Sequence, residues 1–296
     1  MKFKKYIIFS LLGLMIMTSC AEEAQKPKSQ DAKEQVNKSL EKIQGDTETL
    51  IEDIEKIMEI SKKPITVMED EKKKEDNPDN PQNDQENSES SESQKKESED
   101  KKKEKTYEEK KRDELIKRKE EAEKSWMKAY EQVKKLHNQL NDYKIIAIKD
   151  GANDKAIASL DNAINNLTIA IENKNELESL IRANHVTFSL ANFFDMYKGN
   201  IEGDLNRIRY SSREVYIESL KDDFKKAKEE GQKSPEYYTR LSQRIKLDKE
   251  DEKMLDMLNL SIKDLINVIQ YNNKELIKVK RDVVLKNIDA IKEAAK

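Results

Sequence analysis

The sequence predicts an all-α protein: a single helical bundle domain of six or seven helices, preceded by a disordered tether. Charged residues make up 40% of the 296 residues and hydrophobic residues 35%, with only 6 glycines and 5 prolines. Apolar residues recur every three or four positions through most of the second half, and no sustained alternation typical of strands is present. Short polar breaks between these stretches favour a bundle.

The first element, residues 1–19, is predicted to be a lipoprotein signal peptide. It starts with three lysines, continues with an apolar stretch over residues 6–17 and ends with the small residues Thr18 and Ser19. This order is typical of a secretory signal peptide. The apolar stretch is shorter than the roughly 20 residues that cross a bilayer.

The only cysteine of the chain, Cys20, follows directly. The sequence Met-Thr-Ser-Cys resembles the lipobox of bacterial lipoproteins, although Met17 stands where leucine is usual. This resemblance implies cleavage after Ser19, a diacylglyceryl group on the sulfur of Cys20 and a fatty acid such as palmitate on its amine. Because each buried acyl chain adds binding energy, three chains would anchor the mature protein firmly to a membrane.

Residues 20–106 are predicted to be a lipidated tether with a short helix at 34–61. Apolar residues in this helix follow alternating spacings of four and three, although Gly45 interrupts the middle. Three heptads are marginal for a lone helix, so it docks on the main body, pairs with another chain or frays. The apolar positions are Val36, Leu40, Ile43, Thr47, Leu50, Ile54 and Ile57.

The charged segment 69–106 is predicted to be disordered. It contains no apolar residue, so it cannot offset the entropy lost on ordering. A flexible chain of this length spans roughly 35 Å, which would hold the folded body beyond the lipid headgroups. The Asp/Asn cluster at 76–84 lacks the central glycine of a calcium loop and is interpreted as part of this linker.

The helical domain is expected at residues 107–296. Three amphipathic helices are predicted first, separated by Asp150-Gly151 and by the polar break 172–176, with Asn153 or Asp154 as the cap of the second. Their apolar stripes are Leu115, Ala122, Trp126, Ala129, Val133, Leu136 and Leu140, then Ile157, Leu160, Ile164, Leu167 and Ile171, then Leu177, Leu180, Ile181, Phe188 and Phe194.

A turn bracketed by Gly199 and Gly203 is expected next, followed by a short helical segment. Ser211 and Glu214 have the spacing of a capping box, which predicts that a new helix starts there. Gly231 is expected to end that helix.

Three further helices complete the predicted domain. Ser234-Pro235 opens the first, because proline is tolerated at a first helical position. Asp248 is expected to cap the second, and Asn272-Asn273 separates it from the last. Their apolar stripes are Tyr238, Leu241 and Ile245, then Leu255, Leu258, Ile262, Leu265 and Ile269, then Leu276, Val284, Ile288 and Ile291.

No enzyme is expected from this sequence, and no cofactor. It contains no Gly-rich phosphate loop, nucleophile elbow or HExxH motif. His137 and His185 lie in different predicted helices and are expected at surface or packing positions, not as metal ligands. The aromatic residues that are expected in the core are Trp126, Phe188, Phe193, Phe194 and Tyr197.

Charge argues against nucleic acid as a partner. The formal net charge is −3, and loss of the three signal lysines would make it about −6, whereas nucleic-acid binding favours a basic face.

Residues 205–245 carry a more specific pattern. A helix runs into Tyr210-Ser211-Ser212, and a second helix, a polar turn and a third helix follow. The further residues of the pattern are Ile217, Leu220, Phe224, Ser234, Tyr237 and Tyr238. This stretch resembles the Borrelia outer surface lipoprotein paralogous family 54 (complement regulator-acquiring surface protein 1-like), and the resemblance covers roughly residues 177–277 together with the signal and the tether.

The resemblance implies an all-helical lipoprotein on the outer face of a spirochaete's outer membrane. The family includes a homodimeric member that binds complement factor H and dimerises through its carboxy-terminal helix. This chain ends in a Lys-rich amphipathic segment, 276–296, without an aromatic tail. Factor H binding, and the choice between monomer and homodimer, therefore stay open.

The function expected is that of a non-enzymatic surface lipoprotein that binds host macromolecules in immune evasion or persistence. The alternative is a structural or spacer lipoprotein of the cell envelope. Plasminogen is a second candidate ligand, because Lys296 combines a carboxylate with an ammonium group, the pair that plasminogen kringles bind. The other explanation of Lys296 is an accidental lysine in a lysine-rich chain.

Overall fold

The computed structural model describes residues 38–64, 106–248 and 251–295. Within these ranges the chain forms nine α-helices, one 3₁₀ turn and no strand, which confirms the expected all-α bundle. The predicted signal peptide with Cys20, the charged segment up to residue 105, and Lys296 lie outside the described residues.

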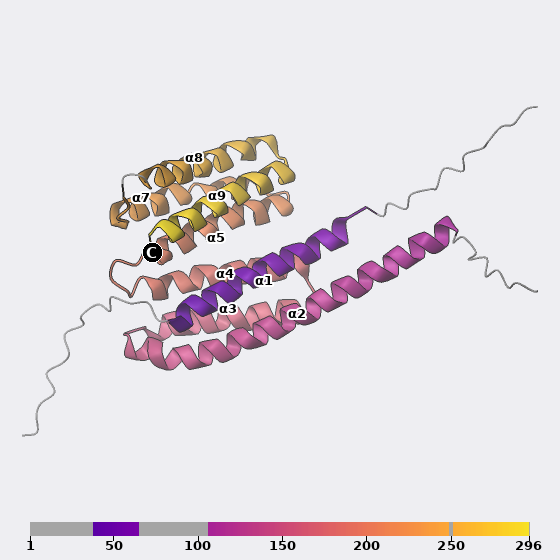
Figure 1. Cartoon of the computed structure of the whole chain (residues 1–296), viewed down its shortest axis with the longest axis horizontal. Helices are drawn as coiled ribbons and strands as arrows, with labels where there is room; N and C mark the ends of the chain where they lie inside the picture. The colour runs from indigo at the N-terminus through magenta and orange to yellow at the C-terminus, as the bar shows by residue number, and fades with distance from the viewer. Residues whose placement is uncertain (1–37, 65–105, 249–250, 296) are drawn as a thin grey trace, which may run out of the picture.

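The helices form two layers (Figure 1). The first contains α1 (Lys38–Lys62), α2 (Tyr107–Lys149), α3 (Asp154–Glu172) and α4 (Glu176–Phe194). The second contains α5 (Glu202–Leu220), α6 (Phe224–Gly231), α7 (Ser234–Arg244), α8 (Glu252–Val268), the 3₁₀ turn (Ile269–Tyr271) and α9 (Lys274–Ala294). The layers meet chiefly where α4 packs against α5.

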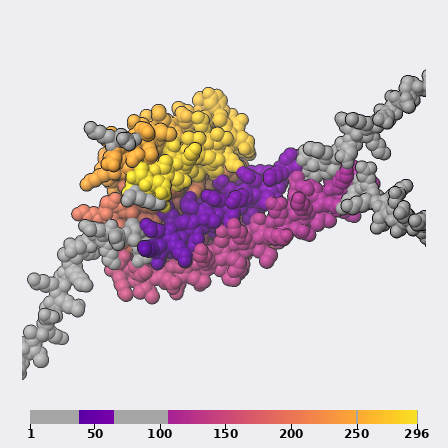
Figure 2. All heavy atoms as spheres, in the orientation of Figure 1, coloured from indigo at the N-terminus to yellow at the C-terminus, as the bar shows by residue number. Residues whose placement is uncertain are grey.

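Helix α1 is part of the core, so of the three alternatives for this segment docking on the body is the one observed. It packs against α2 and α4, and Figure 2 shows it lying along α2. Its buried apolar residues are Leu40, Ile43, Leu50, Ile51, Ile54, Ile57 and Met58. The prediction that residues 20–106 form one tether is therefore corrected. Residues 38–62 belong to the bundle, and the charged segment that follows them connects α1 to α2.

Helix α2 is longer than its neighbours, and its first part extends past them (Figure 1). A capping box starts it: the amide of Glu109 donates to the Thr106 hydroxyl at 3.3 Å, and the amide of Thr106 donates to the Glu109 carboxylate at 2.9 Å. Within α2, no side chain before Trp126 is buried. We call residues 107–125 the α2 arm.

The predicted helix start at Ser211 and Glu214 is wrong, because α5 continues through both residues. The hydroxyl of Ser211 instead donates to the carbonyl of Glu230, at 2.8 Å, and so joins α5 to α6. The expected single helix ending at Gly231 is broken by Asp222, which has a φ of 62°, and Asp223 caps α6. The break between the two helices therefore lies at Asp222 and not before Ser211, and the described part of residues 107–296 forms eight α-helices, against the six or seven predicted.

Most other predicted helix ends are confirmed. The side chain of Asn153 caps α3, and Pro235 lies in the first turn of α7. Asp248 is not the cap of α8, because that helix begins at Glu252 and Asp251 occupies the N-cap position without a side-chain bond. Asp248 contributes its backbone instead of its side chain: its carbonyl accepts a hydrogen bond from the amide of Glu252.

Gly203 allows the start of α5 to approach the end of α4 closely. A Cβ atom at this position would lie 2.9 Å from the carbonyl oxygen of Ala191 and would clash with the side chain of Asp195. The requirement for glycine here is therefore one of packing, since Gly203 has no positive φ, whereas Gly199 in the preceding turn has a φ of 76°.

Candidate functional site

The most unusual element of the fold is α5, which is buried on all sides although it is rich in charge. All but two of its 19 residues are buried. The buried charged residues are Glu202, Asp204, Arg207, Arg209, Arg213, Glu214 and Glu218. Buried charges are tolerated only when partners and hydrogen bonds compensate for lost hydration. The partners of α5 therefore identify the polar centre of the molecule.

Many of these partners come from α1 and α9, which also pair with each other. Helix α1 carries an acidic stripe with spacings of four, three and four: Glu48, Glu52, Glu55 and Glu59. We call the contact region of the three helices the charged seam. Its members are three residues of the acidic stripe, Glu48, Glu55 and Glu59, together with Gln44, Glu202, Asn206, Arg209, Arg213, Lys278, Arg281, Asp282, Asp289 and Lys292.

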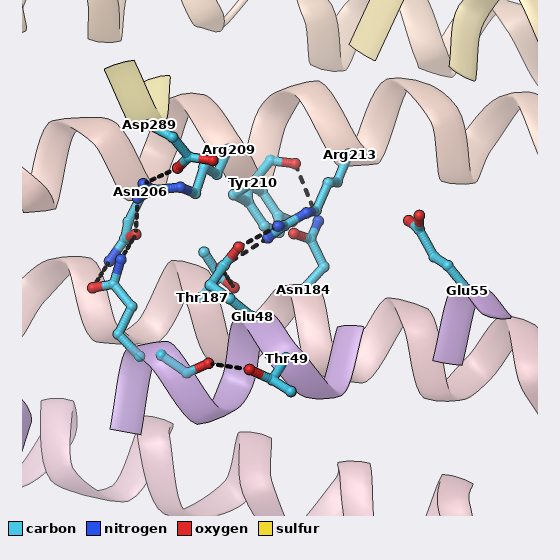
Figure 3. Close-up of polar contacts among 12 residues, drawn as sticks. Glu48, Thr49, Glu55, Asn184, Thr187, Asn206, Arg209, Tyr210, Arg213 and Asp289 are labelled. Carbon is cyan, nitrogen blue, oxygen red and sulfur yellow. Dashed lines mark hydrogen bonds and ion pairs between the residues drawn. The ribbon is translucent and has the colours of Figure 1, made fainter. Parts of the chain in front are cut away.

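Glu48 and Arg213 form a bidentate pair between α1 and α5 (Figure 3). One guanidinium nitrogen donates to the carboxylate at 3.0 Å, the other donates to its second oxygen, and the hydroxyl of Thr187 donates at 3.3 Å. Burial alone would raise the pKa of Glu48, but the charge and hydrogen bonds of Arg213 outweigh burial and lower this pKa to about 2. Glu48 is therefore ionised at neutral pH.

Glu202 accepts hydrogen bonds from three helices. Arg209 donates to it at 2.7 Å and Lys292 at 3.2 Å, and the amide of Gln44 also donates to it. Burial would raise the pKa of Glu202, yet the charges of Arg209 and Lys292 lower it. Arg209 also pairs with Asp289 at 3.1 Å, so α1, α5 and α9 are joined at one point.

Arg281 of α9 is the largest fully buried side chain among the described residues. Its guanidinium lies 4.5 Å from the ring centroid of Tyr216, an arrangement that favours a cation–π contact. It donates to Glu55 of α1 and, at 2.8 Å, to Asp282. One turn away, Lys278 pairs with Glu59, so α9 contacts α1 through ion pairs.

Two shallow hollows lie along the seam. The first, of about 330 Å³, lies above Arg209, Arg213 and Arg281 and is bordered by α1 and α9. The second, of about 310 Å³, contains Tyr216 and Met58. Because the guanidinium groups in the first hollow pair with carboxylates of the same seam, their charges stabilise the joint between the layers.

A second ionic cluster joins α4, α5 and α7. The fully buried carboxylate of Asp204 accepts from Arg244 at 2.9 Å and lies 3.1 Å from Arg240. Asp195 accepts from Arg207 at 2.6 Å. Like the seam, this cluster consists of opposite charges that neutralise one another between helices.

Both histidines pack against neighbouring helices. A ring nitrogen of His137 lies 2.8 Å from the hydroxyl of Thr168. The ring of His185 packs against Tyr210, at 6.0 Å between centroids, and burial lowers its pKa. Among the described residues, no group of three or more His, Cys, Asp or Glu side chains could hold a metal ion.

The expected aromatic core is confirmed for Trp126, Phe193, Phe194 and Tyr197. Phe188 is the exception: its side chain is 38% exposed and packs against Tyr210 at 4.6 Å between centroids. No helix in the described part of the chain has the length and apolar character needed to cross a membrane.

Sequence reasoning missed the charged seam, because carboxylates are so abundant that close pairs carry little information. The acidic stripe was the available signal, since its four residues lie beside the apolar stripe of the same helix. The predicted site residues Cys20 and Lys296 lie outside the described residues.

Comparison of the chain with protein-family models, curated proteins and solved structures finds no match. The resemblance to family 54 therefore stays a prediction from the residues that carry it.

Proposed function

We propose that this chain is a surface-exposed spirochaetal outer-membrane lipoprotein that is not an enzyme and binds host macromolecules in immune evasion or persistence. The observation that carries the proposal is the signal-like start that ends in Met-Thr-Ser-Cys, with Cys20 as the only cysteine. Lipid on Cys20 would tie the bundle to the membrane, and the family resemblance supports display on the outer face.

The arrangement of charges supports a binding function over a catalytic one. The ionisable groups of the seam pair with one another across helix boundaries, as in the contacts Glu48–Arg213 and Arg209–Glu202. A catalytic site instead needs acids and bases that face a substrate with shifted proton affinities. The seam thus supports a rigid scaffold whose outer surface meets other molecules.

Lipidation and display can be tested in the same cells. Radiolabelled palmitate should enter the full-length protein and should not enter the Cys20→Ala variant. Mild protease treatment of intact, washed cells should remove the protein, while a periplasmic marker survives. Retention of the protein under these conditions would contradict external display, and lack of label would contradict the anchor.

The alternative, a structural or spacer lipoprotein of the envelope, is favoured by the long charged helices of the bundle. Crosslinking of intact cells distinguishes the two functions. Capture of periplasmic or envelope components, with no serum protein bound, would support the spacer function.

Factor H and plasminogen are the candidate ligands. The mature chain from residue 20, which keeps α1, should be used to bind proteins from human serum, and recovered proteins should be identified by mass spectrometry. Deletion of Lys296 alone then tests plasminogen. Unchanged plasminogen capture by that variant would discard the terminal lysine as the contact.

A further inference from the structure

The two ends of the bundle differ in which helix termini lie there. At one end, which we call the anchor end, α1 starts and α9 finishes; at the other, the far end, α1 finishes and α2 starts (Figure 1). Gln44 and Lys292 both bond to Glu202, which places the start of α1 beside the end of α9. Arg118 of α2 donates to the carbonyls of Lys63 and Pro64, which places the end of α1 beside the α2 arm.

The antiparallel pairing of α1 with α2 is fixed along its whole length. Lys135 pairs with Asp46 at 2.8 Å near the start of α1, and Lys128 pairs with Asp53 at 2.8 Å near its middle. At 1.5 Å per residue the 43 residues of α2 extend about 64 Å. The anchor end and the tip of the α2 arm are therefore separated by most of the length of the molecule.

Only residues 21–37 connect the proposed lipid site Cys20 to the anchor end. These 17 residues reach at most about 60 Å, and a flexible chain of this length has an r.m.s. span of about 23 Å. The charged segment adds nothing to this reach, because it follows α1. The connection keeps the anchor end within a few tens of ångströms of the bilayer, whereas the tip of the α2 arm can swing out by up to the further length of the body, about 64 Å, so averaged over orientations the anchor end lies nearer the membrane.

We infer that the bundle stands on the membrane with its anchor end inward and the α2 arm outermost. This inference rests on the proposed lipid anchor. The anchor alone says only that the protein is attached to a membrane, whereas the fold says which end of the bundle faces it. The arm, together with the turn between α3 and α4, is then the part that a soluble macromolecule meets first. Lys174 of that turn pairs with Glu123 of the arm, so the two form one surface.

The same orientation places the end of α9 close to the membrane. The last described turn of α9 lies beside the start of α1, as the shared contact with Glu202 requires. A large soluble protein would therefore reach the α2 arm more easily than the carboxyl end of α9. On intact cells this difference in access would hinder binding of a ligand to a carboxy-terminal lysine. It would favour ligands that contact the α2 arm.

The single tryptophan allows a direct test. In a Trp126→Phe background, one variant carries Tyr107→Trp at the tip of α2 and the other carries Ile148→Trp at its opposite end. Tyr107 is 43% exposed and Ile148 is 59% exposed, so both positions accept a larger ring. Each mature chain is coupled through the Cys20 thiol to a maleimide lipid in vesicles that contain a dansyl lipid as the energy acceptor.

Energy transfer from the tryptophan at 148 should be several-fold more efficient than transfer from the tryptophan at 107. Equal efficiencies, or a larger value at 107, would overturn the inference. Circular dichroism of both variants checks that the helices are retained. Because the lipid is attached chemically, the result stands whether or not cells lipidate Cys20, and a negative palmitate experiment would instead contradict the proposed function.

Discussion

At the residue scale, two glycines in helices have opposite roles. A Cβ atom added to Gly45 in α1 would have no atom within 4 Å, whereas a side chain on Gly203 would meet the backbone of α4. The first glycine only weakens its helix, while the second makes the contact between α4 and α5 possible. The amino-acid composition does not distinguish these two glycines, but the atoms packed around each of them do.

The paired substitutions Gly45→Ala and Gly203→Ala test this difference. Alanine at position 45 should raise the free energy of unfolding by about 0.5–1 kcal/mol, because it removes the helix penalty of glycine. Alanine at position 203 should lower it by about 1–3 kcal/mol through overpacking. Urea unfolding followed by circular dichroism measures both, and equal effects would contradict the close approach of α4 and α5.

Glu48 makes the stability of the protein depend on pH. Its pKa is about 2 in the folded protein against 4.5 ordinarily, so its stabilising contribution is complete above about pH 5 and is lost as pH falls toward 2. A shift of this size corresponds to roughly 3 kcal/mol. Between about pH 5 and pH 2, the free energy of unfolding of the Glu48→Gln variant should therefore fall by roughly 3 kcal/mol less than that of the natural protein.

Urea titrations at several pH values provide the measurement. Glu52→Gln is the matched control, because Glu52 lies on the same acidic stripe and is exposed. Its stability curve should run parallel to that of the natural protein. If Glu48→Gln also ran parallel, the pair with Arg213 would not carry the effect.

At the scale of elements, α1 was predictable and its role was not. The alternating spacing of its apolar residues predicted a helix, and the structure has it at Lys38–Lys62. Which surface it covers depends on residues of α2 and α4 far away in the chain, which no local pattern reports. The sequence also did not predict the break at Asp222, because apolar residues on both sides of it suggested one continuous helix.

Removal of α1 should destabilise the rest of the bundle. Burial of each large apolar side chain contributes roughly 1.5–3 kcal/mol, so the apolar face of α1 contributes an amount comparable to the roughly 5–15 kcal/mol typical of a whole domain. A fragment of residues 107–295 should show a lower melting temperature and bind the dye ANS through its exposed core.

A peptide of residues 38–64, added to that fragment, should restore the melting temperature and release the dye. The same peptide with Glu48, Glu55 and Glu59 replaced by glutamine should bind more weakly, because it keeps the apolar face and lacks the charges of the seam. Full stability of the fragment without any peptide would show that α1 is dispensable.

At the scale of the whole molecule, sequence periodicity captured the class of the fold and most of its helices, but not the arrangement of the layers. The seam is formed by residues from α1, α5 and α9, so it exists only once the chain has folded. Its charges look like ordinary surface charges in the sequence, because solvated and paired carboxylates have the same spacing. Burial of Arg281 and Glu202 is therefore visible in the structure alone.

The long connection between α1 and α2 should cost the protein stability. The end of α1 lies beside Arg118, about 18 Å along α2 from Thr106, so a short link suffices. Replacement of residues 69–105 by about eight Gly/Ser residues should raise the free energy of unfolding by about 1 kcal/mol, because closing a shorter loop loses less entropy. A shuffled segment of the original length should leave stability unchanged, and a large loss in the shortened protein would contradict the prediction.

Helix α1 joins the bundle along two flanks, with apolar side chains on one and carboxylates on the other. If the protein is held by its amino end, a pull on that end acts along the axis of α1, and the contacts on both flanks resist together instead of opening one after another. Parallel loading of this kind gives high mechanical resistance from bonds that are individually weak. Under such a pull α1, the first helix of the described residues, would resist as one unit with α2, α4 and α9.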